Sequence, residues 1–300
     1  APAAPRAAAA QALAKTPTPD KSTCEDVAEL LGLQRLTRVV DIGASPIDGV
    51  PPYKGLLDAG LCHVTGFEPQ PEQLAQLHRS KGPHERYLPC VVGDGAEHSL
   101  QLCRSVGFTS LLEPDPASLA LFEFFQPLGQ VLAREHVQTR RLDDIGEIEA
   151  IDFLKIDIQG GELAVFKNGH NKLAQAVFIQ TEVSFVTLYK DQPAWGEVDL
   201  ELRAQGFMPH SFANIKRWPM APAVIDGDPA KPLNQLLEAD VVYIRDVRDM
   251  GTLSDEQLRH MALIAHVCYG SRDLSLRCLI ALQQRKAVAE DAVTQYLALR

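Results

Sequence analysis

The sequence lacks the cysteine and histidine spacings that usually mark a metal site. Its six cysteines form no C-x-x-C pair, and its nine histidines form no H-E-x-x-H or similar pattern. These absences argue against a structural zinc site, and we predict no metal-binding residues from them. No amino-terminal signal-peptide pattern is present either, so we expect the cysteines to be reduced thiols in a cytoplasmic protein.

Long apolar runs and positive charge are scarce as well. No run reaches the roughly 18 residues that a membrane-spanning helix needs, so no membrane span is predicted. Lysine and arginine total 29 against 39 acidic residues, and the formal net charge is -10 at pH 7. Nucleic acids and anionic membranes require a basic surface, so this balance disfavours both as partners.

The composition is otherwise that of a globular protein, with 46% hydrophobic and 23% charged residues. We expect an Ala/Pro-rich linker at residues 1–20, a main domain at 21–246 and a helical extension at 247–300. In the extension, Ser254 and Gln257 form a capping-box signature. The chain begins with alanine rather than methionine, so we expect it to be cut from a longer protein with further domains on its amino-terminal side.

Short apolar runs alternate with helix-period segments along the main domain. The runs predicted to be strands are 38–42, 63–67, 87–92, 151–156, 177–181, 207–211 and 241–245. This alternation predicts a Rossmann-like α/β fold, with a seven-stranded, mostly parallel sheet and helices on both faces. The proline-rich loop 219–232 indicates a closing hairpin, and segment 94–142 is expected to be an insertion or a lid over the sheet edge.

Acidic residues stand where the first three strands should end, which is where an open α/β sheet binds ligands. Asp41 ends the first strand beside a Gly-Ala turn, and Glu68 ends the second before Pro69. A carboxylate at the end of the second strand can accept hydrogen bonds from ribose hydroxyls, although Glu68 could also be only a loop carboxylate. Asp94 follows the third strand, where it could reach an adenine amino group or simply form an Asp-Gly turn.

Two nucleoside cofactors are compatible with these strand ends. A dinucleotide requires G-x-G-x-x-G so that the backbone can approach a pyrophosphate, but Ser45 and Pro46 interrupt that pattern. S-adenosylmethionine has no phosphate and tolerates a looser loop with one essential glycine, here Gly43. The residues therefore favour S-adenosylmethionine. The alternative, a nicotinamide cofactor, would make the protein a dehydrogenase.

The order of the motifs resembles that of the FkbM-type methyltransferases, from about residue 37 to residue 246. It runs D-I-G-A, F-E-P, T-S-L, R-L-D-D-I and K-I-D-I-Q-G-G-E, and it closes with a strand ending in Glu182. The resemblance implies a class I S-adenosylmethionine-dependent enzyme that methylates a hydroxyl on a sugar, glycan or small metabolite. It also implies a set of cofactor-binding residues: Asp41, Gly43, Ala44, Ser45, Glu68, Pro69, Asp94 and Ser110.

The sequence departs from the family pattern in two places. The family commonly has D-x-G-A-N-x-G, whereas Ser45 replaces the Asn and the next glycine is Gly49. It commonly has Glu where Gln159 stands, and Gln keeps hydrogen bonding without the charge. These departures leave a second interpretation open, in which the chain is a degenerate cofactor-binding module with a structural or regulatory role in a larger glycan-assembly protein.

Methyl transfer to a hydroxyl needs a group that takes the hydroxyl proton. We assign that role to Asp157, with Lys155 and Glu162 orienting it and Glu182 as the second carboxylate candidate. Lys155 and Asp157 share one face of their strand, which permits an ion pair that would lower the pKa of Asp157. Paired carboxylates could instead hold Mg²⁺, which prefers oxygen ligands.

The acceptor itself cannot be named from the residues. We expect its binding determinants in segments 108–131, 186–195 and 215–232, whose aromatic side chains could stack on a sugar or pack in the core.

Overall fold

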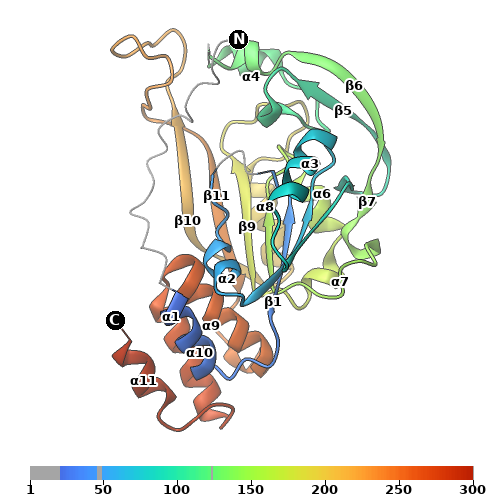
Figure 1. The fold of residues 1–300 in the computed structure, drawn as a ribbon. Coiled ribbons are helices and arrows are strands. Elements are labelled where there is room, and N and C mark those ends of the chain that lie inside the picture. The colour runs from blue at the N-terminus through green and yellow to red at the C-terminus, as the bar shows by residue number, and fades with distance from the viewer. Residues whose placement is uncertain (1–20, 46–48, 123, 300) are drawn as a thin grey trace.

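The computed structural model describes residues 21–45, 49–122 and 124–299, so the predicted linker at 1–20 lies outside the described residues. Its central sheet has seven strands in the order β10-β11-β9-β8-β1-β2-β3 (Figure 1). The bounds are β1 Thr37–Ile42, β2 Cys62–Phe67, β3 Glu85–Leu88, β8 Phe153–Ile156, β9 Phe178–Ser184, β10 Phe207–Trp218 and β11 Gln235–Arg245. Strand β11 is antiparallel to β9 and β10, and the other pairings are parallel. The predicted Rossmann-like sheet and its closing hairpin are confirmed.

The third strand is shorter than the predicted 87–92. It ends at Leu88 because Pro89 has no N–H to donate to a neighbouring strand. The next two strand residues form β4, Val92–Gly93, which pairs outside the main sheet with β7, Arg140–Arg141.

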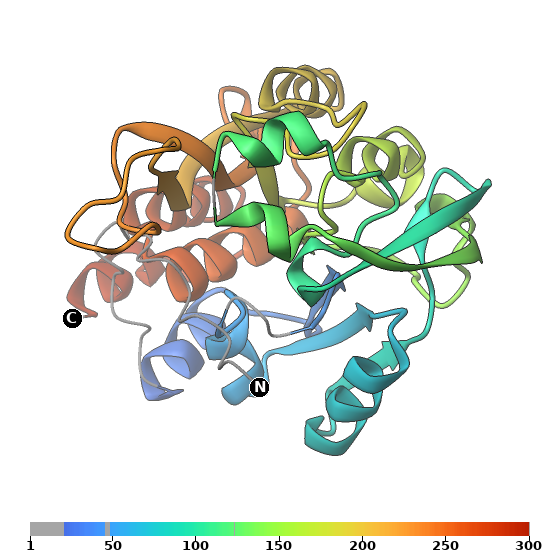
Figure 2. The same cartoon turned by 90° about the horizontal axis from the view of Figure 1, so that it is seen from above.

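The segment between β4 and β7 forms a separate layer at the end of the sheet. Strand β5, Glu97–Cys103, pairs with β6, Val131–Gln138, in an antiparallel ribbon that curves around the molecule (Figure 2). Between them lie η1 Val106–Phe108, α4 Pro116–Ala120 and α5 Phe125–Leu128. Asp115 starts α4 as an N-cap, because its carboxylate accepts from the N–H groups of Ala117 and Ser118.

Helices cover both faces of the sheet, as predicted. One face carries α1 Lys21–Leu30, α2 Lys54–Asp58, α9 Asp255–Tyr269, α10 Arg272–Gln284 and α11 Ala292–Ala298. The other face packs against α6 Glu162–Lys167, α7 His170–Leu173 and α8 Trp195–Ala204. The remaining elements are α3 Pro71–Ser80, η2 Leu142–Asp144 and η3 Met250–Thr252. No helix in the described part of the chain is long and apolar enough to cross a membrane.

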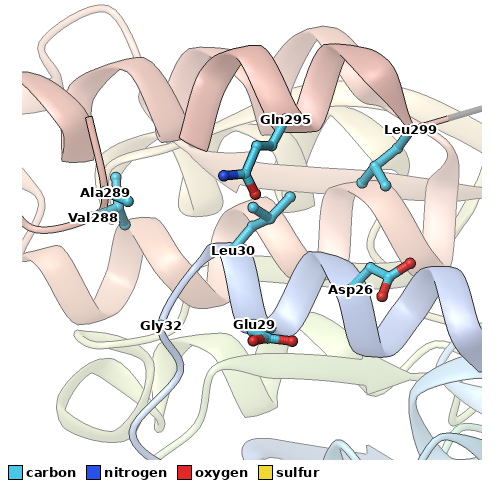
Figure 3. Close-up of a pocket in the computed structure, with 8 residues that line it drawn as sticks. All are labelled: Asp26, Glu29, Leu30, Gly32, Val288, Ala289, Gln295 and Leu299. Carbon is cyan, nitrogen blue, oxygen red and sulfur yellow. The ribbon is translucent and has the colours of Figure 1, made fainter. Parts of the chain in front are cut away.

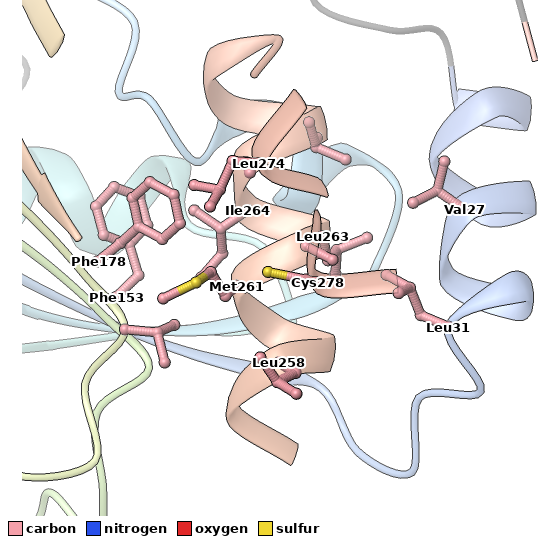
Figure 4. Packing of buried hydrophobic residues seen from close by; sticks show 14 of the residues in the cluster. Val27, Leu31, Phe153, Phe178, Leu258, Met261, Leu263, Ile264, Leu274 and Cys278 are labelled. Atoms are coloured by element: carbon pink, nitrogen blue, oxygen red, sulfur yellow. The ribbon is translucent and has the colours of Figure 1, made fainter. Parts of the chain in front are cut away.

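The helices after β11 share the hydrophobic core of the sheet. Ser254 and Gln257 make the expected capping box at the start of α9. Met261 of α9 is fully buried and belongs to the same cluster as Phe153 and Phe178 of the strands (Figure 4).

A buried ion pair joins the amino-terminal edge of the sheet to α9. The Arg35 guanidinium donates to both carboxylate oxygens of Asp152 at 2.6 and 2.8 Å, and its Nε lies 3.2 Å from Glu256. Glu256 also contacts Nε2 of the fully buried His260, whose Nδ1 contacts Thr37 Oγ1 at 3.0 Å. This network connects the loop before β1, the start of β8 and α9.

We predict that Arg35→Met lowers the free energy of unfolding by about 3 kcal/mol, because it leaves the Asp152 carboxylate buried without its partner. Arg38→Met is the matched control, since Arg38 pairs with the exposed Glu149 carboxylate; it should cost less than about 1 kcal/mol. Urea unfolding of the three proteins measures both values. Equal small losses in the two variants would show that the Arg35 network does not hold α9 to the sheet.

Candidate active site

The strand order reverses between β1 and β8, so the carboxyl ends of these strands form the crevice where α/β sheets bind ligands. Asp41 and Lys155 are register partners there. Lys155 Nζ lies 3.4 Å from Asp41 Oδ1 and donates to the Gly43 carbonyl at 3.1 Å. The Tyr53 hydroxyl donates to Asp41 Oδ2 at 2.6 Å. The structure thus pairs Lys155 with Asp41, where the sequence suggested Asp157, because the neighbouring strand presents Asp41 at the same level.

Gly43 brings the end of β1 against the end of β8. Its φ is +80°, and a Cβ added to it would lie 2.0 Å from the Asp157 carbonyl oxygen. Its N–H and that of Ala44 both donate to the Phe67 carbonyl of β2 at 3.1 Å. Only glycine fits this turn, which places bare backbone between β2 and β8.

Glu68 lies at the end of β2 and is 3% exposed. Its carboxylate accepts from the Gln70 N–H at 2.8 Å, and burial raises its pKa above the usual value. Pro69 follows it before α3 begins. On the neighbouring loop, Ser45 Oγ donates to Gln73 Oε1 at 3.2 Å, while residues 46–48, which carry the departure from the family loop, lie outside the described residues.

Asp94 is held inside a turn. Its carboxylate accepts from the Ala96 N–H and Thr139 hydroxyl and contacts His98 Nε2 at 2.8 Å. The Ala96 hydrogen bond, followed by the contacts with His98 and Thr139, lowers the pKa of Asp94. These contacts support the turn interpretation of Asp94-Gly95.

The loop between β8 and α6 is anchored by two of the predicted site residues. Glu162 Oε1 accepts from the N–H groups of Ile158 at 2.9 Å and Gly160 at 3.2 Å, and burial raises its pKa to about 7. Ser110 Oγ donates to the Gln159 carbonyl at 2.7 Å from the β5–β6 insertion. Both side chains bind backbone, so their contacts shape the loop that follows Asp157.

An amide links the two carboxylates predicted to act on the acceptor. Gln159 Nε2 donates to Asp157 Oδ1 and to Glu182 Oε2, each at 2.9 Å. The Tyr189 hydroxyl donates to Gln159 Oε1 at 3.3 Å. The structure therefore brings Asp157 and Glu182 together at the carboxyl ends of β8 and β9.

Three further charged residues surround Glu182, and the sequence analysis did not select them. Lys216 Nζ lies 3.3 Å from Glu182 Oε1 and 2.6 Å from Glu238 Oε1. Burial and the neighbouring carboxylates of Asp157 and Glu238 raise the pKa of Glu182 well above its usual value. The sequence contains a pattern that could have revealed this cluster: Glu238 and Asp240 stand at alternate positions in a mostly apolar strand, so their side chains share one face.

The aromatic residues near the site mostly belong to a small core. Phe122, Phe125, Tyr189 and Trp218 are at most 6% exposed and pack with Leu119, Leu188 and Leu237. Trp195 Nε1 donates to the Tyr243 hydroxyl at 3.0 Å. These contacts support the core interpretation for those rings rather than open sugar-stacking faces.

No group of three or more His, Cys, Asp or Glu side chains among residues 21–45, 49–122 and 124–299 is placed to hold a metal ion. Asp157 and Glu182 accept from one amide nitrogen, so the Mg²⁺ alternative finds no support. A pocket of about 450 Å³ between α1 and α11 includes none of the predicted site residues; its lining is Asp26, Glu29, Leu30, Gly32, Val288, Ala289, Gln295 and Leu299 (Figure 3).

The sheet order and the glycine-lined, acidic switch point are those of a class I S-adenosylmethionine-dependent methyltransferase. The family model of the methyltransferase FkbM domain matches residues 41–209, so the chain belongs to the FkbM methyltransferase family.

Similar proteins include the 2-O-methyltransferase NoeI of Sinorhizobium fredii, 27% identical over 208 residues, which cover 63% of this chain and 76% of NoeI. A proline–tRNA ligase of Variovorax paradoxus is 72% identical over 39 residues; the match spans 13% of this chain and only 7% of the ligase. Among solved structures, the magnesium protoporphyrin IX methyltransferase of Synechocystis aligns with a TM-score of 0.37 and 10% identity, covering 75% of this chain and 79% of that one.

We predict that Gly43→Ala lowers the free energy of unfolding by about 2–4 kcal/mol, because its Cβ meets the Asp157 carbonyl and its φ is unfavourable for alanine. Gly196→Ala in α8 is the control, since its added Cβ has open space. Thermal unfolding compares the variants. A Gly43→Ala protein as stable as the Gly196→Ala protein would contradict the close approach of β1 and β8.

A second prediction concerns Asp240. Burial and the neighbouring Asp157 carboxylate raise the pKa of Asp240 to about 7. The folded chain holds this proton more tightly than the unfolded chain, so Asp240 lowers stability progressively as the pH rises from about 4 to about 7. Asp240→Asn should therefore gain stability over the unmodified protein across that window, on the order of 4 kcal/mol for about three pKa units at about 1.4 kcal/mol per unit. Urea unfolding at a series of pH values measures the difference.

Asp246→Asn is the control for this titration, because the Arg248 hydrogen bonds lower the pKa of Asp246 to about 2. Its folded-state pKa is depressed, so removing the carboxylate should give no gain, or a small loss, as the pH rises. A pH-independent difference for Asp240→Asn would show that Asp240 does not hold its proton in the folded protein.

Proposed function

We propose that the protein transfers the methyl group of S-adenosylmethionine to a hydroxyl oxygen of a sugar, a glycan or another small hydroxylated metabolite. The observation that carries this proposal is the pair formed by the half-buried Asp157 carboxylate and the buried Glu182 carboxylate, held together beside the Gly43 turn. An alcohol is a weak nucleophile that must lose its proton as it reacts, and a positioned carboxylate can take that proton. The relative NoeI is a 2-O-methyltransferase, which favours oxygen as the acceptor atom.

The residues at the switch point fit an adenosyl cofactor. Asp41 Oδ1 is buried and makes no hydrogen bond among the described residues, with the ion-paired Lys155 Nζ 3.4 Å away, and Gly43 adds no side chain of its own to the turn. Glu68 presents a buried carboxylate suited to ribose hydroxyls, and the backbone of Gly43, Ala44 and Ser45 is suited to the methionine end. When bound, S-adenosylmethionine supplies an electrophilic methyl group on a positively charged sulfur.

We assign the chemical roles within this chain as follows. Asp157 accepts the proton of the acceptor hydroxyl, and Glu182, whose pKa is raised by burial, is the protonated member of the pair. Lys155 binds Asp41 and the Gly43 carbonyl and so keeps the end of β1 in place. Glu162 and Ser110 hold the loop that carries Asp157's neighbours, which aligns the acceptor for in-line transfer. Residues 21–246 would form the methyltransferase domain, with 247–300 completing one face of its sheet.

We predict that Asp157→Asn lowers the rate of methyl transfer at least about 100-fold, the usual contribution of a general base. Binding of S-adenosylmethionine, measured by calorimetry, should change less than about threefold, because the carboxylate assigned to the ribose hydroxyls is Glu68 at the end of β2. The rate is measured as release of S-adenosylhomocysteine with hydroxyl acceptors. Asp58→Asn, which alters an exposed carboxylate on α2, is the control for both measurements.

A full rate in Asp157→Asn would show that Asp157 is not the base. Tight cofactor binding with no turnover of any hydroxyl acceptor by the unmodified protein would favour the cofactor-binding module instead. Transfer to amine or carboxylate acceptors, but not to hydroxyls, would retain the methyltransferase and reject O-methylation.

A further inference from the structure

We propose that Gln159 is a positioning residue of this methyltransferase, whose side-chain amide binds Asp157 and Glu182 at once and keeps the two carboxylates beside one another for the acceptor. The inference rests on the proposed function, because it concerns the site to which the base role is assigned. Gln159 is the position at which the sequence departs from the Glu common in the family.

Every polar group of the Gln159 side chain is engaged in this arrangement. Nε2 donates its two hydrogens to different carboxylates, and Oε1 accepts from the Tyr189 hydroxyl. Tyr189 is 3% exposed, and its single hydroxyl hydrogen is shared between Gln159 Oε1 at 3.3 Å and the Phe108 carbonyl at 3.2 Å, so the group that orients the amide is itself fixed. The amide therefore has one orientation in which all partners are satisfied.

The backbone at Gln159 is also set for this contact. Its φ is +58°, a left-handed conformation uncommon for residues other than glycine. The Ser110 hydroxyl holds the Gln159 carbonyl, and Glu162 holds the following Gly160 N–H. Strained conformations of this kind persist where the surrounding contacts determine them, and they are frequent at functional sites.

Charge explains why an amide suits this position. The titratable and charged groups around the pair come from each packed element: Asp41 of β1, Lys155 of β8, Glu162 of α6, Tyr189 after β9, Lys216 of β10, and Glu238 and Asp240 of β11. Carboxylates outnumber lysines among them. A neutral double donor stabilises the ionised form of Asp157 without adding charge, whereas a third carboxylate would remove both donors and add repulsion.

The decisive experiment compares pH profiles of kcat/KM for the unmodified protein, Gln159→Glu and Gln159→Gly. In the Gln159→Glu profile, the midpoint of the rise in kcat/KM on the acid side should lie about one pH unit higher. Methyl transfer should then be about 10-fold slower at pH values below that midpoint, and the rates of the two proteins should converge at high pH. Gln159→Gly keeps the left-handed backbone and removes only the amide. It should give a smaller upward shift, and its cofactor affinity at pH 8 should stay within about threefold.

A second readout needs no turnover. Side-chain carboxyl carbons are titrated by ¹³C NMR in the folded protein, and Gln159→Glu should raise the apparent pKa values assigned to the Asp157 and Glu182 pair. Gln205→Glu is the matched control, because Gln205 Nε2 also donates to a carboxylate, that of Glu201, on α8. It should leave both the profile and the titration unchanged.

The outcomes separate the two proposals. Superimposable titrations for Gln159→Glu and the unmodified protein would overturn the positioning role, as would a rate lowered equally at every pH, which a merely structural role predicts. If the unmodified protein fails to methylate any hydroxyl but the titration moves as expected, the electrostatic role of Gln159 stands and the proposed acceptor chemistry fails.

Discussion

The site depends on the contact between the backbone of Gly43 and the Asp157 carbonyl. A side chain at Gly43 would have to occupy the space of that carbonyl, so the ends of β1 and β8 meet only because the turn is bare. This contact fixes where the Asp157 side chain starts and lets Lys155 reach both Asp41 and the Gly43 carbonyl. The residues proposed to bind the cofactor and those proposed to bind the acceptor are therefore positioned by one close approach of the backbone of β1 and β8.

Buried acidic residues have different surroundings at the two ends of the parallel strands. Where the strands begin, Arg35 donates two short hydrogen bonds to Asp152, and the pair connects the loop before β1 to β8. Where the strands end, Glu182 and Asp240 have raised pKa values because burial and like charges oppose ionisation. The first arrangement supports the fold near neutral pH, and the second lowers stability as the pH rises, which is typical of functional sites.

Local patterns predicted most of the fold, because apolar runs, the D-I-G-A turn and the Ser254 cap are properties of short segments. They could not predict the partner of Lys155, since that depends on which strand lies beside β8 in space. For the same reason, the sequence did not place Glu238 and Asp240 at the site; they reach it only because β11 lies between β9 and β10 in the sheet. Asp94 is compatible with a turn and with an adenine contact; the Thr139 hydroxyl beside the β4–β7 pair supports the turn, and the adenine contact stays a prediction.

The cluster of acidic side chains around Asp157, the proposed base, must leave that carboxylate ionised if it is to take a proton. Burial and the charge of Asp157 raise the pKa values of Glu182 and Asp240, so these two neighbours favour their neutral forms and leave the negative charge to Asp157. Lys216 binds Glu182 and Glu238, and the Gln159 amide adds two donors without charge. A lysine at position 159 would bind the carboxylates more strongly and hold Asp157 in an ion pair that weakens it as a base. A neutral donor allows the carboxylate to be both ionised and basic, which is the combination that proton transfer from a hydroxyl requires.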